Sequence, residues 1–217
     1  MRPESQIDKL ANEFVKTLAK NYPSFATSIG FPGGERDLDD HSPEALERDY
    51  QLAKQTIAQL KALPVQDAVD EVTVDAMLQS LGAEIAMHES GLGYRNLNNI
   101  ASPAQDVRDI FDLTPTGTAE NWEDISHRLR KVTESLRGYA RTLTIGFESG
   151  DAPAKRQVEA TIEQIKQIVE GQFFENFVAS AKPELSDGLK SDLQAAAKEA
   201  SAGYQEFSDF LVQMLPS

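Results

Sequence analysis

His88 and Glu89 form the most suggestive chemical pair in the sequence, because both lie in a segment predicted to be helical. In one helical zinc motif, two histidines four residues apart hold the metal ion, and a glutamate next to the first acts as the base. Here the position of the second histidine is Leu92, so we expect no zinc site. His88 falls on the apolar stripe of its helix. We expect it to be partly buried and hydrogen-bonded, with Glu84, one turn earlier, as its local partner.

The acidic loop from Asp37 to His41 is a second group of potential metal ligands. Calcium-binding loops place oxygen ligands at alternating positions, with glycine at the sixth position and a bidentate glutamate at the twelfth. Counted from Asp37, the fifth position is His41, the sixth is Ser42 and the twelfth is Arg48. The loop therefore breaks the calcium pattern, and we interpret it as a solvated loop that leads into a helix.

The other motifs that could carry chemistry are incomplete. His127 lies off the apolar stripe of its predicted helix, so we expect it on the solvent-exposed face. The glycine-rich stretches match neither GxxxxGK[ST] nor GxGxxG, no serine lies in GxSxG, and the chain has no cysteine. The sequence therefore predicts no catalytic, cofactor-binding or metal-binding residue in this chain.

The charge balance limits the partners that we expect. Asp and Glu number 35 against 21 Lys and Arg, which gives a formal net charge of -14. Such a charge repels both the phosphate backbone of nucleic acid and an anionic membrane surface. The opening segment lacks the apolar run of a signal peptide, and no stretch approaches the roughly 20 apolar residues of a membrane-spanning helix. We therefore expect a cytoplasmic protein without nucleic-acid or membrane partners.

Apolar residues three and four positions apart predict helices throughout the first half of the chain. Ser42 followed by Pro43 is a typical helix start, because serine caps free backbone amides and proline has no amide hydrogen to leave unpaired. The segment 31–41 before them is predicted to be a loop. The predicted helices begin after Ser5, at Pro23, after Ser42 and near Asp67, and they end near residues 21, 29, 63 and 91.

The second half continues the helical pattern after an irregular segment at 94–103. The string TLTIGF could alternatively form a strand, because Leu143, Ile145 and Phe147 alternate with smaller residues, but the longer helical period of the surrounding segment favours a helix. The predicted elements are a short helix around 107–111, a long helix from Thr118 through Leu143, a helix from Asp151 to Phe177, and a last helix from Ser186 that Pro216 would stop.

These elements predict one all-α domain over residues 1–217. We expect an elongated antiparallel bundle of about six to eight helices, several of them long. Phe174, Tyr204 and Phe210 lie off the main apolar stripes of their helices. They indicate either two buried faces on each helix or a face that further protein covers.

Residues 23–50 resemble the amino-terminal signature of the bacterial domain of unknown function 885 family. In that signature a first helix leads to a proline, an Ala-Thr pair, a glycine after an aliphatic residue, an acidic loop and a Ser-Pro helix start. The matching residues are Pro23, Ala26, Thr27, Gly30, Asp39, Ser42 and Pro43. The later organisation, from the helix pair at Trp122 to Phe177 to the last helix, is also similar to that family.

The resemblance implies a helical relative of zinc-dependent peptidases that are similar to thermostable carboxypeptidases. In that family the metal motif lies in the carboxy-terminal half, and none of His41, His88 and His127 matches it. The expected identity is thus the amino-terminal helical portion of such a protein, inactive alone, with the carboxy-terminal half as its partner and the zinc in that half. The alternative is a complete helical-bundle binding or scaffold protein. We also expect a homodimer through the later helices, with Phe174, Tyr204 and Phe210 at the contact.

Overall fold

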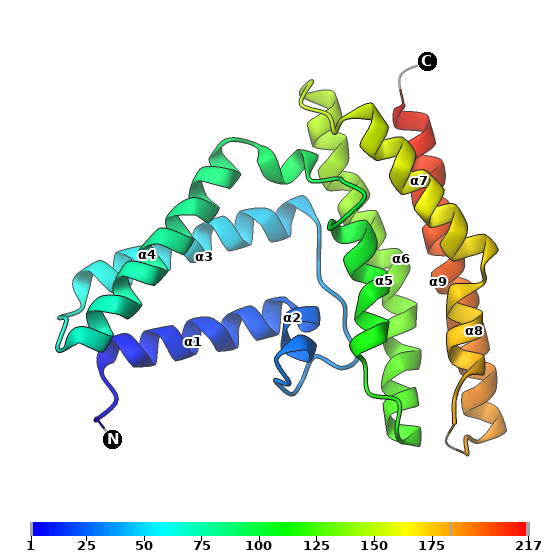
Figure 1. Ribbon diagram of the computed structural model, residues 1–217, viewed down its shortest axis with the longest axis horizontal. Coiled ribbons are helices and arrows are strands. Elements are labelled where there is room, and N and C mark those ends of the chain that lie inside the picture. The colour runs from blue at the N-terminus through cyan, green and yellow to red at the C-terminus, as the bar shows by residue number, and fades with distance from the viewer. Residues whose placement is uncertain (1, 183, 216–217) are drawn as a thin grey trace.

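The computed structural model describes residues 2–182 and 184–215, and within them the chain is helical without any strand (Figure 1). The all-α prediction is confirmed. No helix in this part of the chain combines the length and the apolarity needed to cross a membrane. The elements are α1 (Gln6–Asn21), α2 (Pro23–Ser28), α3 (Pro43–Ala62), α4 (Ala68–Glu89), η1 (Leu92–Arg95), α5 (Pro103–Leu113), α6 (Ala119–Glu148), α7 (Lys155–Glu170), α8 (Phe173–Ala179) and α9 (Asp187–Met214).

Side-chain caps fix the starts of the long helices. Ser5, Ser42, Thr118 and Ser186 each accept a hydrogen bond from the backbone N–H three residues later, and Asp67 does the same at the start of α4. Each cap satisfies an amide that the helix itself leaves unpaired. The helix starts predicted from these residue types are confirmed. Pro216, the predicted stop of the last helix, lies outside the described residues.

Two hydrophobic cores organise the described part of the chain. The first lies within an arm formed by α1, α3 and α4, where Ile7, Leu60 and Leu81 are almost fully buried. The second lies within a bundle formed by α5 to α9, which stands beside the arm in Figure 1. In the bundle, Leu129 and Val132 have no exposed surface, so the apolar stripe predicted for this helix is confirmed.

Helix α6 continues to Glu148, so the string TLTIGF is helical and the strand alternative is wrong. This helix packs along α9, and the two run parallel, because Arg130 pairs with Glu199 and Arg137 pairs with Glu206 further along both helices. The predicted antiparallel arrangement is therefore wrong for this pair. The chain can enter α9 in the same direction because α7 and α8 together carry it back along the bundle (Figure 1).

Gly203 allows α6 and α9 to approach closely. A Cβ atom at position 203 would lie 2.5 Å from Thr133 Oγ1 and 3.0 Å from Thr133 Cα. Because the second contact is with the backbone, a larger residue could be accommodated only by moving one helix away from the other.

The helix predicted from Asp151 to Phe177 is divided into α7 and α8. Gln172 has a φ of 52°, in the left-handed region, which interrupts the helical hydrogen bonds after Glu170. The break turns the chain so that Phe174 points into the core, where its ring lies 5.5 Å from that of Phe111 and 5.6 Å from that of Tyr204.

Two of the three aromatic residues predicted for a dimer contact are fully buried in the structure. Phe174 and Tyr204 have no exposed surface, and the Tyr204 hydroxyl donates a 3.0 Å hydrogen bond to the carbonyl oxygen of Ala104. Only Phe210 remains partly exposed. The helices therefore have two buried faces here, and Phe174 and Tyr204 cannot contact another molecule.

A row of polar side chains on α6 joins the bundle to the arm. Arg128, Ser135 and Thr142 are spaced seven residues apart, which places them on one face of the helix, and all three are buried. Ser135 donates to the carbonyl oxygen of Asp39 and Thr142 to that of His41, each over 2.7 Å. We call these three residues the polar seam. It satisfies backbone oxygens of the loop that links α2 to α3.

Arg128 makes most of the hydrogen bonds of the polar seam. Its guanidinium donates to the carbonyl oxygens of Gly34 and Asp37 and to the hydroxyls of Thr27 and Thr114. Burial lowers its pKa from the ordinary value, while nearby carboxylates, first that of Glu35, oppose this change. One side chain thus connects α2, the loop, the end of α5 and α6.

Replacing Arg128 with methionine should lower the free energy of unfolding by roughly 3 to 5 kcal/mol, because several buried acceptors lose their donor together. Chemical denaturation followed by circular dichroism measures this loss. The matched control is Arg141→Met on the same helix. Arg141 forms an exposed ion pair with Glu44, so its loss should cost at most about 1 kcal/mol. Equal losses in the two variants would contradict the role given to Arg128.

Candidate functional site

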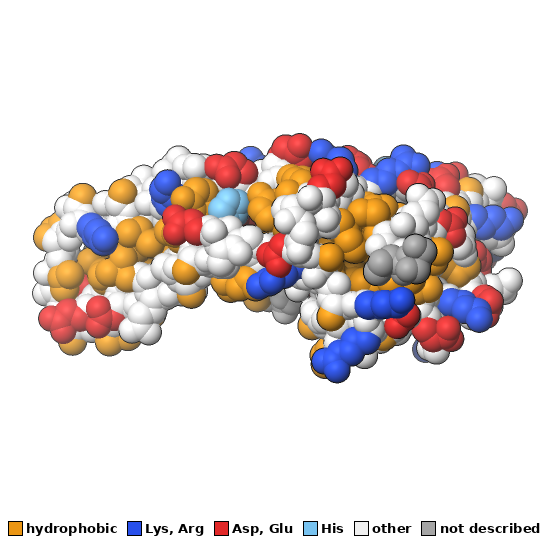
Figure 2. Space-filling model, turned by 90° about the horizontal axis from the view of Figure 1, so that it is seen from above, with side chains coloured by type: hydrophobic (Ala, Val, Ile, Leu, Met, Phe, Trp, Pro, Cys, Tyr) orange, Lys and Arg blue, Asp and Glu red, His pale blue; other side chains and the backbone are white. Residues whose placement is uncertain are grey.

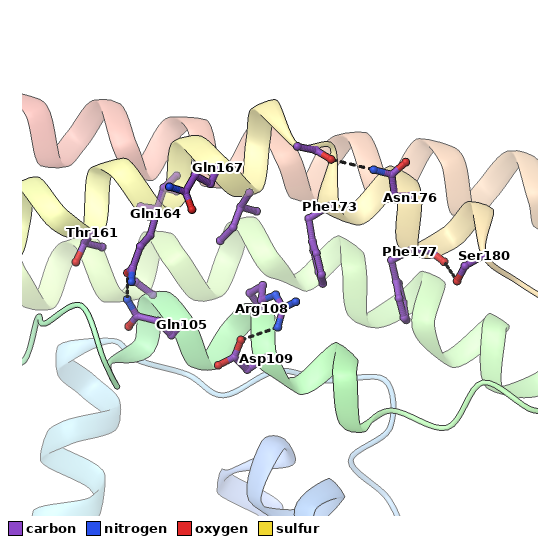
Figure 3. A pocket seen from close by; sticks show the side chains of 14 residues that line it. Gln105, Arg108, Asp109, Thr161, Gln164, Gln167, Phe173, Asn176, Phe177 and Ser180 are labelled. Atoms are coloured by element: carbon purple, nitrogen blue, oxygen red, sulfur yellow. Dashed lines mark hydrogen bonds and ion pairs between the residues drawn. The ribbon is translucent and has the colours of Figure 1, made fainter.

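The candidate site is a groove of about 620 Å³ between α5, α7 and α8 (Figure 3). Its volume lies within the range of small-ligand pockets. One side is formed by residues of α5 from Ala104 to Asp109. The other side extends along α7 and α8 from Thr161 to Ser180, so the groove is longer than a single helical turn.

Amide side chains line the end of the groove near Thr161. Gln105 Nε2 donates a 2.8 Å hydrogen bond to Gln164 Oε1, and Gln164 Nε2 donates a 2.9 Å bond to the carbonyl oxygen of Asn99. These bonds fix the orientation of both amides. Thr161 has no exposed surface, and no group in the described part of the chain hydrogen-bonds to its buried hydroxyl.

Planar groups line the other end. The guanidinium of Arg108 lies over the ring of Phe173, 4.1 Å from its centroid, in a cation–π contact. Arg108 also pairs with Asp109 and Asp112. The rings of Phe173 and Phe177 are nearly parallel, with an interplanar angle of 8°. Figure 3 shows both rings pointing from α8 toward α5.

The groove is close to electrically neutral although the protein is strongly acidic. Arg108 and Asp109 are the charged side chains of the lining, and they form an ion pair with each other. The polar remainder consists of amides and hydroxyls, namely Gln105, Gln164, Gln167, Asn176, Thr161 and Ser180. The site can therefore donate and accept hydrogen bonds without offering a net charge, which suits a neutral ligand.

No motif in the sequence indicates this groove. Its walls depend on the break at Gln172, which brings Phe173 and Phe177 beside α5, and that break was not predicted. The available signal was the concentration of glutamines on the exposed side of the predicted helix, at Gln164 and Gln167.

His88 is partly buried at the contact between α3 and α4, as predicted. Its ring stacks on that of Tyr50 with centroids 4.3 Å apart, and its Nε2 lies 3.4 Å from Glu47 Oε2. The predicted partner Glu84 is wrong, because the ring faces α3 and not the preceding turn of its own helix. Tyr50 also donates a hydrogen bond to Glu89, so both members of the suspected zinc pair have structural contacts.

The acidic loop turns its carboxylates toward backbone amides. Asp39 accepts from the amide of Ser24 and Asp40 from that of Ser42, each over 2.9 Å. Burial raises the pKa of Asp39. The prediction of a solvated loop is therefore wrong for its inner side, which the polar seam covers. Among residues 2–182 and 184–215, no three His, Asp or Glu side chains are grouped to hold a metal ion.

The other two histidines have separate environments. His127 is exposed on α6, as predicted. His41 lies at the end of the acidic loop, with its ring centroid 6.2 Å from that of Tyr139 and its Nε2 buried. None of the three histidines lines the groove.

The comparison with known proteins identifies the family. The model of the family described as bacterial protein of unknown function (DUF885) matches residues 23–217, which is most of the chain. The chain therefore belongs to this family, and the predicted membership is confirmed. No curated protein matches the chain. The matched range includes the acidic loop, the polar seam and every residue of the groove.

His41 should make the protein less stable in mild acid. Desolvation by burial lowers its pKa from 6.5 to about 4. Between these values the unfolded chain binds a proton that the folded protein does not, so stability falls as the pH drops. From pH 7 to pH 5 this histidine should cost about 2 kcal/mol.

Urea denaturation of the wild type and of His41→Phe at both pH values isolates this effect from that of carboxyl groups such as Asp39, whose raised pKa has the opposite sign. The phenylalanine should preserve the contact with Tyr139 and leave no unpaired nitrogen. A stability difference between wild type and variant that is the same at both pH values would contradict the prediction.

Proposed function

We propose that this chain is a non-catalytic helical region of a peptidase-like protein and that it packs against a further, metal-binding part. The observation that carries the proposal is a second apolar stripe on α4. The helix buries one stripe in the arm and leaves the other on the surface. A helix that is apolar on both faces is typical of a buried position.

The exposed stripe of α4 repeats at steps of three and four residues. Its members are Val69, Val72, Ala76, Ser80, Ala83 and Met87, and none of them is charged. Val72 is 68% exposed, and Val69 and Met87 are each 53% exposed. The opposite face of the same helix carries Leu81, which is buried, and Val74, which packs against the arm core. Figure 2 shows hydrophobic side chains gathered along the arm.

Exposed apolar stripes of this length mark interaction surfaces in soluble proteins. The small side chains at 76, 80 and 83 would let another helix approach closely, because they leave its backbone room. In the peptidase-like proteins that the sequence resembles, the metal motif lies in the carboxy-terminal half. A covering part of that kind would contain the zinc and the catalytic residues, and the present chain would form a wall beside it.

A second candidate function is a self-sufficient helical-bundle binding protein. The groove between α5, α7 and α8 favours it, because a pocket with oriented amides does not need a catalytic part to bind a ligand. In that case the exposed stripe of α4 would serve a homodimer. The dimer contact would then lie on α4 and not on the later helices, where the sequence predicted it.

The isolated chain should hydrolyse no peptide, with or without added zinc, because the proposed catalytic residues lie in another part of the protein. Fluorogenic amino- and carboxypeptidase substrates provide the measurement. A chelator added in parallel serves as the control for trace metal. Zinc-dependent turnover that the chelator abolishes would contradict the proposal.

The α4 stripe can be tested with two valines that lie on opposite faces of the helix. Val72→Asp should leave the melting temperature nearly unchanged, because Val72 is exposed, and it should reduce the binding of a hydrophobic dye. Val74→Asp should lower stability by several kcal/mol, because it places a charge against the arm core.

Sedimentation at two salt concentrations completes this test. The wild type should self-associate more strongly when salt screens its net charge of -14, and Val72→Asp should weaken that association. Equal dye binding and equal self-association in the wild type and Val72→Asp would show that the exposed stripe of α4 is not the surface through which the chain associates.

A further inference from the structure

We infer that the groove between α5, α7 and α8 binds an uncharged, extended polypeptide segment that carries an aromatic or aliphatic side chain. The inference is independent of the peptidase proposal, because it depends only on the shape and chemistry of the groove. A ligand of this class has peptide amides, which can hydrogen-bond to the amide side chains of the lining. It also has an apolar side chain, which can pack on the aromatic rings of the lining.

The amide end of the groove matches a peptide backbone. The side chains of Gln105 and Gln164 hold each other through one hydrogen bond, and Gln164 is held again by the carbonyl oxygen of Asn99. Gln105 Oε1 already accepts from the amide and the hydroxyl of Ser102, so Gln105 keeps one free N–H, whereas Gln164 keeps one N–H and one lone pair. A peptide N–H or C=O can use this capacity without reorganising the site.

Thr161 supplies the observation that points most directly to a ligand. Its hydroxyl is buried at the groove, and no described residue hydrogen-bonds to it. Burying a hydroxyl without a partner costs free energy. Because Thr161 has no exposed surface, its side chain must turn toward the groove before a backbone carbonyl or amide of a bound segment can supply the missing partner, and the cost that the free protein carries would then be recovered.

The aromatic end of the groove matches a side chain of the same segment. Arg108 and the ring of Phe173 form one stacked layer, with Phe177 parallel to the ring. Aromatic and aliphatic groups pack favourably against such surfaces. Both carboxylates that pair with Arg108 are already in place, so an acidic ligand group would have to compete with Asp109 and Asp112.

The length and the charge of the groove favour a polypeptide segment over a compact ion. The lining extends from Thr161 to Ser180 along two helices, and the amide end and the aromatic end are separated along this length (Figure 3). A compact group could use only one end at a time. An anionic ligand would lose its hydration beside Arg108, whose charge Asp109 and Asp112 already compensate.

Trp122 offers an internal reporter. It is the single tryptophan of the chain, it is buried, and its ring centroid lies 5.4 Å from that of Phe177. A segment that contacts Phe177 should therefore change the tryptophan fluorescence. The binding of an N-acetylated, C-amidated hexapeptide, Ala-Phe-Gln-Leu-Ala-Ser, can be followed in this way and by isothermal titration calorimetry on the full chain.

Phe173→Ala should weaken binding of the blocked hexapeptide at least tenfold, because it removes the stacked layer. The matched control is Phe210→Ala, which truncates another partly exposed phenylalanine on α9, away from the groove, and should leave the affinity unchanged. A counterpart peptide with glutamate and aspartate in place of glutamine and serine should bind at least tenfold more weakly than the neutral peptide.

Thr161→Val distinguishes a binding role from a purely structural one. The variant should raise the melting temperature, because a buried hydroxyl without a partner is removed, and yet bind the hexapeptide roughly fivefold more weakly. Absence of binding to the wild type up to about 1 mM peptide would overturn the inference. So would equal affinity in Phe173→Ala and Thr161→Val compared with wild type, or equal binding of phenylalanine amide alone.

Discussion

The structure depends on the satisfaction of backbone oxygens in the loop between α2 and α3. This loop leaves α2 and runs along α6 to α3 without a helix or strand of its own, so its carbonyl groups need side-chain donors. Arg128, Ser135 and Thr142 provide them from one face of α6. The seven-residue spacing of these donors matches the path of the loop along the helix. The two hydrophobic cores are thereby joined by a polar contact, and the orientation of the arm follows from hydrogen bonds whose directions are fixed.

Much of the helical architecture could be predicted because it is encoded locally. Caps such as Ser42 and Asp67, and the apolar stripe around Leu129, depend only on neighbours in the sequence. The break at Gln172 could not be predicted in this way. A non-glycine residue in the left-handed region has a local cost, and the buried contacts of Phe174 with Phe111 and Tyr204 offset it.

The candidate site could not be predicted from the sequence for the same reason. Motif searches favour histidines and carboxylates, and here His41 and His88 have structural environments in the loop and between the arm helices. The groove instead combines glutamines, an arginine and phenylalanines from three helices. Its members become neighbours only after α5 packs beside the break between α7 and α8. Buried Arg128 was likewise missed, because an arginine next to an apolar stripe is ordinarily exposed.

Two kinds of contact hold α6 and α9 together, a buried close approach and an exposed ion pair. Gly203 sets the distance between the helix axes, because its missing side chain admits the backbone at Thr133. The bidentate pair of Arg137 with Glu206, at 2.7 and 2.8 Å, is placed where it resists sliding of one helix along the other. The close approach thus depends on one buried glycine, while the exposed ion pair adds only a weak contact at the edge of the interface. Sequence drift at the exposed pair would therefore cost at most about 1 kcal/mol and leave the buried contacts in place, whereas drift at the glycine would force the two backbones apart and widen the bundle.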